Sequence, residues 1–400
     1  MTSIPTTPAG SGVSDRGTYT YIAVYSAVLY TVLLIAPVIG GKLTEQFGLS
    51  AGQLGMLFSC ELGAFSLATV PAYLWLRRMN LRTATYLFTA VVILGNLASG
   101  FIDSFEWLVA ARIITSLAAG SITVIILSLA GKTSNPSRAF GFFVVFQLVM
   151  GALILAIFPS LFAGSGVAAI YWTLSGLAVL CLFVVRSIDG EALRRPAAEG
   201  TVVVAPVKIP VVRFVLGLAA VLLFYVSLSG VWSFMAQIST GAGVGLSATS
   251  LVLAGATVAG IASALIATVL GDTPRRRAFL LIGYIGMAIS IALLFGAPGL
   301  LRFAVAAVIF KFAWTFILPY LLSSLSDLSS NGHVMNTTNL MIGSGFAIGP
   351  VVCGTMIEST GSFVPMLTMA VIGVVASMVC VQAMQGRRKA APSQAASVPA

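Results

Sequence analysis

The sequence predicts an all-α polytopic membrane protein with twelve transmembrane helices in two pseudo-symmetric bundles of six. Composition is the first reason: 58% of the 400 residues are hydrophobic and only 8% are charged, whereas about 25% of the residues of a soluble domain are charged. The second reason is a series of twelve apolar runs, each near the ~20 residues that cross a bilayer as a helix. The third is an internal repeat across a polar segment. Helices are expected because backbone groups in lipid must be paired internally and the ten-residue alternation of barrel strands is missing.

Six apolar runs precede a polar linker and six follow it. In chain order they cover residues 19–39, 53–76, 84–101, 107–130, 140–161, 167–185, 214–235, 250–270, 279–295, 301–325, 335–357 and 363–384. We therefore expect a cytoplasmic tail (1–17), a first bundle (18–185), a cytoplasmic linker (186–210), a second bundle (211–385) and a disordered cytoplasmic tail (386–400). Residues before Gly17 lack the basic-then-apolar pattern of a signal peptide, so the first helix is expected to stay in the membrane.

The two bundles share a short motif. Residues 47–51 read FGLSA, residues 244–248 read VGLSA, and each motif enters the second helix of its bundle. A basic cluster follows each of these helices, at residues 77–82 and 275–277. Parallel repeats of this kind are typical of transporters whose substrate site lies between the halves near mid-membrane.

Lys and Arg are distributed unevenly between the two sides of the predicted bundle. With the N-terminus in the cytoplasm, the outer loops carry only Lys42 and Arg302, and the inner loops and termini carry the other basic residues of the loops. The positive-inside rule then predicts both termini in the cytoplasm. The expected location is the inner membrane of the cell. The same bias explains the net charge of +10, so nucleic-acid binding is not indicated.

Enzymatic and metal chemistry lack the residues that they need. The four cysteines form no C-x-x-C pair, and His333 is the only histidine, so neither a disulfide framework nor a metal site is predicted. No Walker loop, acidic metal cluster or His-based catalytic set is present, and we expect no enzyme activity and no cofactor. The expected partners are a small-molecule substrate, protons and the lipid bilayer, and the expected state is a monomer.

The fourth apolar run contains Arg112, followed one and two helical turns later by Ser116 and Gly120. On this pattern the chain resembles the major facilitator superfamily over nearly its whole length, with Ser116 where that family usually has glycine. The resemblance implies two six-helix halves around a cavity lined by the first, fourth, seventh and tenth helices. It places Arg112 on the wall of that cavity, where its small, polar face could serve either as a helix contact or as cavity lining.

The resemblance also implies a cytoplasmic latch of acidic and basic residues after the second helix of each half. The second copy has Asp272 and Arg276, whereas the first keeps Arg77 and Arg78 but has lost the acid. We expect these four residues to act in gating. The family's drug antiporters carry a Gly-Pro motif in the fifth helix, but here the pair occurs in the eleventh helix, at Gly349 and Pro350. This difference weighs against drug export, and the glycines around it are expected to serve helix packing.

Three ionisable residues lie well inside the predicted helices: Glu61, Arg112 and Lys311. Charges inside a membrane are costly and are functional by default. In the functional interpretation, Arg112 grips a carboxylate through two nitrogens and Lys311 adds a second positive charge. Glu61 carries the coupling proton, because a buried carboxyl group can be neutral near pH 7. In the structural interpretation, Glu61 pairs with Lys311 or Arg112 and locks the halves together.

Further polar and aromatic residues occur on the helices that are expected to line the cavity. We expect six of them to contact substrate in addition to the two cations: Tyr30, Gln147, Trp232, Gln237, Trp314 and Asn339. Aromatic rings could sandwich a planar substrate, although each ring taken alone is more often a packing residue.

These observations favour a secondary transporter that works by alternating access. The preferred function is proton-coupled uptake of a small organic anion, with aromatic acids among the candidates. The alternative is proton-coupled efflux of hydrophobic or cationic compounds. A sensor or scaffold without transport activity is a third possibility, but the short tails and linker offer no soluble domain for it.

Overall fold

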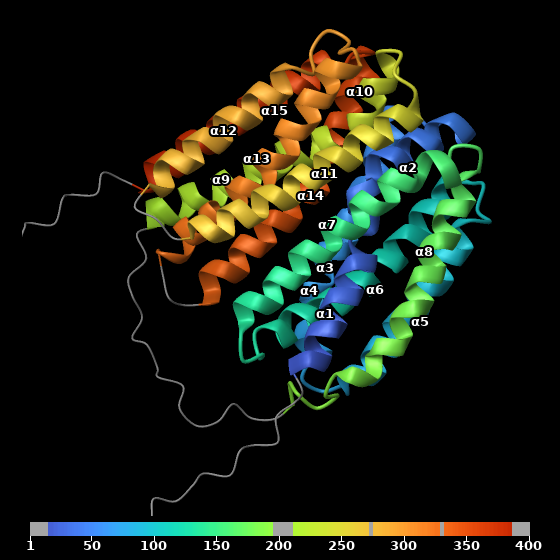
Figure 1. The fold of residues 1–400 in the computed structure, drawn as a ribbon, viewed down its shortest axis with the longest axis vertical. Helices are drawn as coiled ribbons and strands as arrows, with labels where there is room; N and C mark the ends of the chain where they lie inside the picture. The colour runs from blue at the N-terminus through green and yellow to red at the C-terminus, as the bar shows by residue number, and fades with distance from the viewer. Residues whose placement is uncertain (1–14, 195–210, 272–274, 329–331, 386–400) are drawn as a thin grey trace, which may run out of the picture.

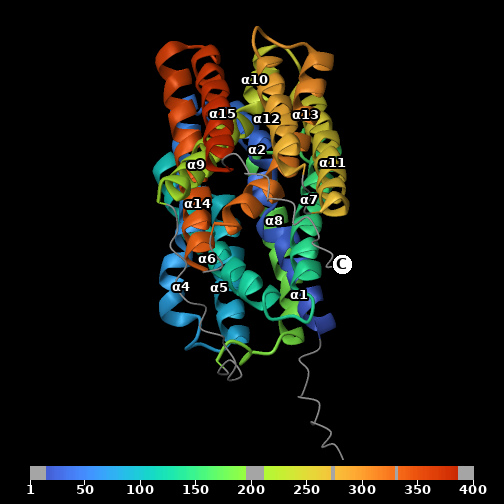
Figure 2. The same cartoon turned by 90° about the vertical axis from the view of Figure 1, so that its left-hand side faces the viewer.

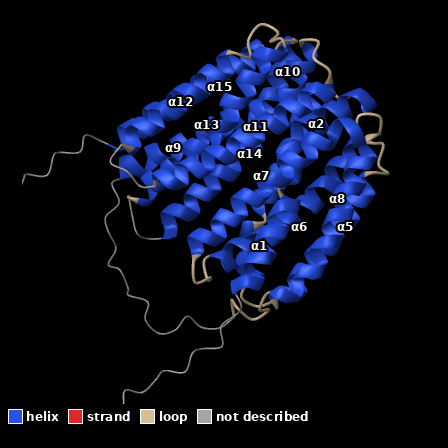
Figure 3. Cartoon of the chain, in the orientation of Figure 1, coloured by secondary structure: helices blue, strands red, loops and turns tan. Residues whose placement is uncertain are grey.

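The computed structural model describes residues 15–194, 211–271, 275–328 and 332–385 (Figure 1). Within these ranges all regular secondary structure is helical, and no strand occurs among them (Figure 3). The predicted all-α fold is confirmed. The two expected tails, apart from residues 15–17, and most of the expected linker lie outside the described residues.

The first half of the chain contains two spans that are each divided into two helices. α1 (Asp15–Leu29) continues after Tyr30 as α2 (Thr31–Phe47), and α3 (Ala51–Leu67) continues after Ala68 as α4 (Thr69–Trp75). The remaining helices of this half are α5 (Leu81–Ser99), α6 (Phe105–Ala130), α7 (Pro136–Leu161), α8 (Val167–Cys181) and the short 3₁₀ helix η1 (Leu182–Ser187).

The second half begins with another divided span. α9 (Val211–Ser233) continues after Phe234 as α10 (Met235–Gly241). It is followed by α11 (Leu246–Leu270), α12 (Arg276–Ala292), α13 (Leu300–Ser326), α14 (Gly332–Thr360) and α15 (Val364–Gln385).

Eleven helical stretches among the described residues are long and apolar enough to cross a membrane. The remaining expected span, residues 279–295, forms α12, whose 17 residues are at the short end of the range of about 17–25 that crosses a bilayer. A tight turn follows it, in which Gly296 and Ala297 both have positive φ, 67° and 50°. The helix therefore ends a few residues before the apolar run does.

The repeated motif takes a different shape in each half. In the first copy, Gly48 ends α2 with a φ of 63°, and Ser50 caps α3 through a reciprocal pair of hydrogen bonds with Gln53, 3.2 and 3.0 Å long. In the second copy, Gly245 has a φ of −62° and itself caps α11. Ser247 then lies inside the first turn, so the sequence repeat does not produce a repeated cap.

The two halves converge at one end of the bundle and separate toward the other (Figure 1). Figure 2 shows the molecule from the left-hand side of that view. We call the end at which α1 begins and α15 stops the terminal end, and the end that contains the 48–50 and 242–245 connections the opposite end. α3 packs along α14 and α7 packs along α11, so these two helix pairs join the halves.

The contact between α3 and α14 is close because glycine faces glycine. A side chain at Gly55 would collide with the Pro350 carbonyl, and one at Gly354 would collide with the Ala51 carbonyl. Small residues of this kind let helix backbones approach in a membrane. The glycines of α14 therefore serve packing, as the sequence predicted.

Candidate functional site

A cavity of about 1270 Å³ lies between the first half of the chain and α14. Its walls come from α1 to α6 and α8 on one side and from residues 337–347 of α14 on the other. It reaches the terminal end, where Tyr73, Arg77 and Ser128 line it. The cavity therefore follows the separation of the halves that Figure 1 shows.

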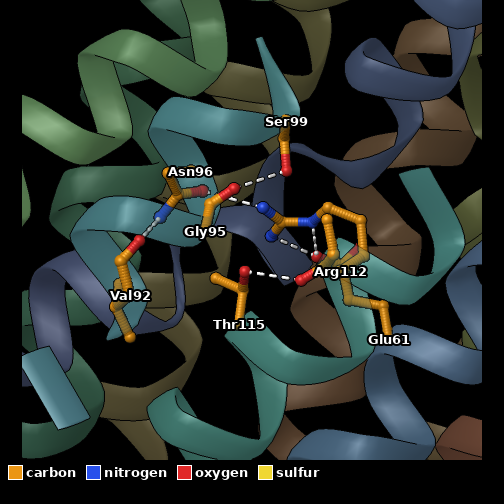
Figure 4. A network of polar contacts seen from close by, with 8 residues as sticks. Glu61, Val92, Gly95, Asn96, Ser99, Arg112 and Thr115 are labelled. Atoms are coloured by element: carbon orange, nitrogen blue, oxygen red, sulfur yellow. Dashed lines mark hydrogen bonds and ion pairs between the residues drawn. The ribbon is translucent and has the colours of Figure 1, made fainter. Parts of the chain in front are cut away.

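An ion pair between Arg112 of α6 and Glu61 of α3 forms part of the cavity wall (Figure 4). The Arg112 Nε donates to Glu61 Oε1 at 2.7 Å, and Arg112 Nη2 donates to the same oxygen. The two residues are 1% and 5% exposed. Because a buried charge is stable only when it is paired and hydrogen-bonded, each residue provides what the other needs.

The remaining nitrogen of the guanidinium is held by α5. Arg112 Nη1 donates to Asn96 Oδ1 at 2.8 Å, and Asn96 Nδ2 donates in turn to the Val92 carbonyl at 2.9 Å (Figure 4). The ring of Tyr171 lies 4.9 Å from the guanidinium carbon. Arg112 is thus fixed in position by α3, α5 and α8 together.

The small, polar face of α6 is both a helix contact and a cavity wall. All of its predicted members line the cavity: Arg112, Thr115, Ser116, Ala119, Gly120 and Thr123. Gly120 also lies directly against the Phe65 carbonyl of α3, where a side chain would collide. The pairing foreseen in the structural interpretation is present, but Glu61 and Arg112 belong to the same half, so their ion pair does not bridge the halves.

Lys311 occupies a different environment in α13. It is 1% exposed, and its ammonium lies 4.0 Å from the ring centre of Trp232 and 3.9 Å from that of Trp314. No hydrogen-bond partner of the Lys311 ammonium is found among the described residues. Lys311 and the two tryptophans do not line the cavity, so this structure does not bring the two predicted cations together in one site.

The other predicted contact residues are divided in the same way. Tyr30, at the break between α1 and α2, and Asn339 of α14 line the cavity. Gln237 is outside it, and both polar atoms of its buried amide lack a partner within the described parts of the chain. Gln147 is half-buried on α7 and also lies outside the lining.

The structure describes three of the four predicted gating residues, Arg77, Arg78 and Arg276. Arg77 lies at the cavity mouth, and both it and Arg78 are exposed. Arg276 pairs with Asp327, which follows α13 in the same half, at 2.5 Å. Asp272 lies outside the described residues.

Two residues that contact Arg112 were missed by the sequence analysis, Asn96 and Tyr171. Asn96 had a usable signal, because an amide inside an apolar run is rare and usually faces the bundle interior. Tyr171 had none, since tyrosines near helix ends are common at membrane interfaces.

The sequence matches the model of a known protein family. A family model described as the Major Facilitator Superfamily matches residues 20–240, which is more than half of the chain. No curated protein matches the sequence significantly.

Several solved structures have a similar fold. A D-xylose–proton symporter has a TM-score of 0.75 at 13% identity, covering 92% of this chain and 97% of its own. The nucleoside transporter NupG has a TM-score of 0.71 at 12% identity, covering 94% and 100%. A bacterial homologue of the human lysosomal transporter Spinster, in an inward-facing and unoccupied conformation, has a TM-score of 0.67 at 15% identity, covering 94% and 95%. At these identities the likeness concerns the fold alone.

Proposed function

The chain belongs to the major facilitator superfamily, and on this premise we propose that it takes up a small organic anion together with protons. Aromatic acids are among the candidate substrates. Transport would proceed by alternating access, in which two six-helix halves, residues 18–185 and 211–385, rock about the interface between them. We place a monomer in the inner membrane, with substrate, protons and lipid as its partners.

The orientation in the membrane is part of this proposal. Arg77, Arg78 and Arg138 lie at the terminal end of the bundle, and basic residues favour the cytoplasmic side. With the terminal end in the cytoplasm, the cavity is open to the cell interior and closed to the outside. The arrangement described above is then the one from which an imported substrate leaves.

The ion pair between Glu61 and Arg112 is the observation that carries the proposal. Two nitrogens of Arg112 are turned toward a single oxygen of Glu61, and a guanidinium fork of this kind also suits the carboxylate of a substrate. When Glu61 takes up a proton, it loses the charge that holds Arg112. A substrate anion can then take its place, so the proton and the anion are bound together.

The charge of the cavity supports an anionic substrate. The acidic and basic residues of its lining are Glu61, Arg77 and Arg112, which is one more basic residue than acidic. Lys311 would add a second positive charge at a later stage, because it lies behind Trp232 and would be uncovered when the halves part at the opposite end. A membrane-buried cation without a counterion is a functional group by default.

Uptake into proteoliposomes tests this function. The probes are radiolabelled lactate and benzoate, an aliphatic and an aromatic monocarboxylate, offered under an inward proton gradient. We expect gradient-driven accumulation of at least one probe. Arg112→Lys should reduce the rate about 10-fold or more, because a lysine cannot replace the two-pronged contact of an arginine.

The proposed role of Glu61 as the proton carrier is tested by a separate variant. Glu61→Gln imitates the protonated acid, so exchange of internal for external probe should continue while the dependence on the proton gradient disappears. Arg302→Lys is the control, since Arg302 is exposed at the opposite end and donates to the Gly296 carbonyl. Unchanged uptake in Arg112→Lys, or no gradient-driven uptake of any monocarboxylate, would contradict the proposal.

The largely apolar lining of the cavity favours a second candidate, the export of hydrophobic or cationic compounds in exchange for protons. Expression should then raise drug tolerance, and Glu61→Gln should abolish the gain. The geometry speaks against this candidate, because Glu61 is already engaged by Arg112 and does not offer a free carboxylate to a cation.

A further inference from the structure

Pro37 leaves a backbone carbonyl of α2 without its usual partner. In an α-helix the carbonyl of residue 33 accepts from the N–H of residue 37, and Pro37 lies inside the helix but has no N–H to donate. In a membrane such a carbonyl must find another donor. Leu33 therefore needs a hydrogen bond from outside its own helix.

The donor is a side chain of the other half. Trp232 Nε1 donates to the Leu33 carbonyl at 3.1 Å, across a separation of 199 residues in the chain. Trp232 belongs to α9 and is 1% exposed. The hydrogen bond that α2 lacks is thus made across the interface that must open and close during transport.

The indole of Trp232 is held rigidly for this contact. It stacks on Phe310 with an interplanar angle of 11° and meets Trp314 edge-on at 5.9 Å. The Lys311 ammonium lies over the same ring at 4.0 Å. Because the ring is fixed by α13 of its own half, its N–H moves only when the second half moves.

The bond lies at the closed end of the cavity. Leu33 is part of the lining, and beyond it α2 packs against α10 and α11 of the other half. There Gly40 lies against the Gln237 amide, and Gly41 against the Leu246 side chain. Leu33 thus marks the boundary between the open part of the interface and the sealed part.

We propose that Trp232 is a gating residue that seals the opposite end. Its indole N–H donates to the Leu33 carbonyl, which has no donor within its own helix because residue 37 is a proline. The role rests on the alternating access proposed above and differs from substrate contact. Closure pairs the carbonyl with the indole, and opening exposes the carbonyl to water instead. The gate can therefore break and re-form, because the carbonyl has a partner in both arrangements.

Hydrogen exchange measured by mass spectrometry on the full chain in lipid nanodiscs tests the gate without any substrate. Trp232→Phe keeps an aromatic ring but removes the N–H. Exchange in residues 38–47 and 235–241 should become about 3- to 15-fold faster, which corresponds to the strength of hydrogen bonds between membrane helices. Trp314→Phe is the matched control, because Trp314 contacts the same lysine, and it should change exchange less than twofold.

A second variant links the effect to Pro37. Pro37→Ala restores the helical donor to the Leu33 carbonyl, so adding Trp232→Phe in that background should change exchange less than twofold. Equal effects of Trp232→Phe and Trp314→Phe would overturn the proposal, and so would a full effect of Trp232→Phe in the Pro37→Ala background. If Trp232→Phe does not fold, Trp232→Leu, which removes the indole N–H and adds no other donor, replaces it in the same comparison.

The hydrogen-exchange test of the gate does not depend on which substrate is transported. Failure of lactate and benzoate uptake would count against the proposed anion transport and leave the exchange result standing. Normal uptake with unchanged exchange in Trp232→Phe would overturn the gate and leave the transport proposal standing.

Discussion

The two halves of the molecule differ in how their buried long polar side chains are paired. In the first half, Arg112 is paired with Glu61 and bonded to Asn96. In the second half, the Lys311 ammonium, the Gln237 amide and the Tyr320 hydroxyl are buried without a hydrogen-bond partner within the described residues. In the first half these polar groups have their hydrogen-bond partners in the conformation described. In the second half they lack partners in this conformation.

This difference bears on the proposed transport cycle. An unpaired buried polar group costs free energy, and a second conformation in which the group is paired or hydrated would recover that cost. The cavity accordingly lies against the first half and only α14 of the second. We infer that the polar groups of the second half find water or substrate when the opposite end opens.

The largest expected change in stability comes from breaking the ion pair between Glu61 and Arg112 in the first half. Arg112→Gln leaves Glu61 buried and unpaired, and the free energy of unfolding should fall by about 3–5 kcal/mol, the usual cost of removing one partner of a buried pair. Unfolding by SDS, followed by circular dichroism, measures it. The double variant with Glu61→Gln should recover most of the loss, and a single variant as stable as the unaltered chain would show that the pair is not buried in the membrane.

Removing the charge of Lys311 should raise the free energy of unfolding. Lys311→Met keeps the length of the side chain and removes an ammonium that has no counterion, so the free energy of unfolding should rise by roughly 1–3 kcal/mol. The same SDS titration compares it with Arg112→Gln. A loss of stability would mean that the two tryptophan rings compensate the charge fully.

Removing the Gln237 amide should also raise the free energy of unfolding, but by less than removing the Lys311 ammonium. Gln237→Leu replaces two unpaired polar atoms by methyl groups, and a gain of about 1 kcal/mol in the free energy of unfolding is expected. The thermal unfolding midpoint in detergent, followed by intrinsic fluorescence, reports it. Gln46→Leu is the control with the opposite sign, because Gln46 of the first half accepts from the Val167 N–H.

An effect similar in size to that at Gln237, but of opposite sign, is expected at Asn96. Asn96→Ala removes one hydrogen bond from Arg112 but leaves the ion pair, so the loss should be about 0.6–1.7 kcal/mol, as for other hydrogen bonds between membrane helices. A cycle with Arg112→Gln isolates the interaction. If the two losses simply add, Asn96 does not help to position the guanidinium.

The sequence was sufficient for the fold and for identifying Glu61, Arg112 and Lys311 as buried charges, because both follow from the cost of placing groups in lipid. Lys42, which was expected in an outer loop, is buried near the end of α2. Glu61 and Arg112 could be found since a charge in an apolar run needs an interior partner. That they would pair with each other could not be chosen over a pair between Glu61 and Lys311. The choice depends on how each helix is rotated, and periodicity does not fix the rotation of one helix against another.

The placement of Lys311 shows a second limit. It was expected to share a substrate site with Arg112, but the structure places it behind two tryptophans and outside the cavity. A transporter has more than one arrangement, and a single sequence encodes all of them. The hydrogen bond between Trp232 and Leu33 could not be predicted for the same reason, although Pro37 indicated that the Leu33 carbonyl lacks a donor within its helix.

The size and position of the cavity have a consequence for inhibition. Its volume of about 1270 Å³ exceeds the roughly 300–1,000 Å³ of typical small-molecule sites, so a small monocarboxylate would share it with water. A larger compound could fill it and hold the halves apart at the terminal end. With that end in the cytoplasm, such a blocker would have to enter the cell before it could act, and added substrate outside would not displace it.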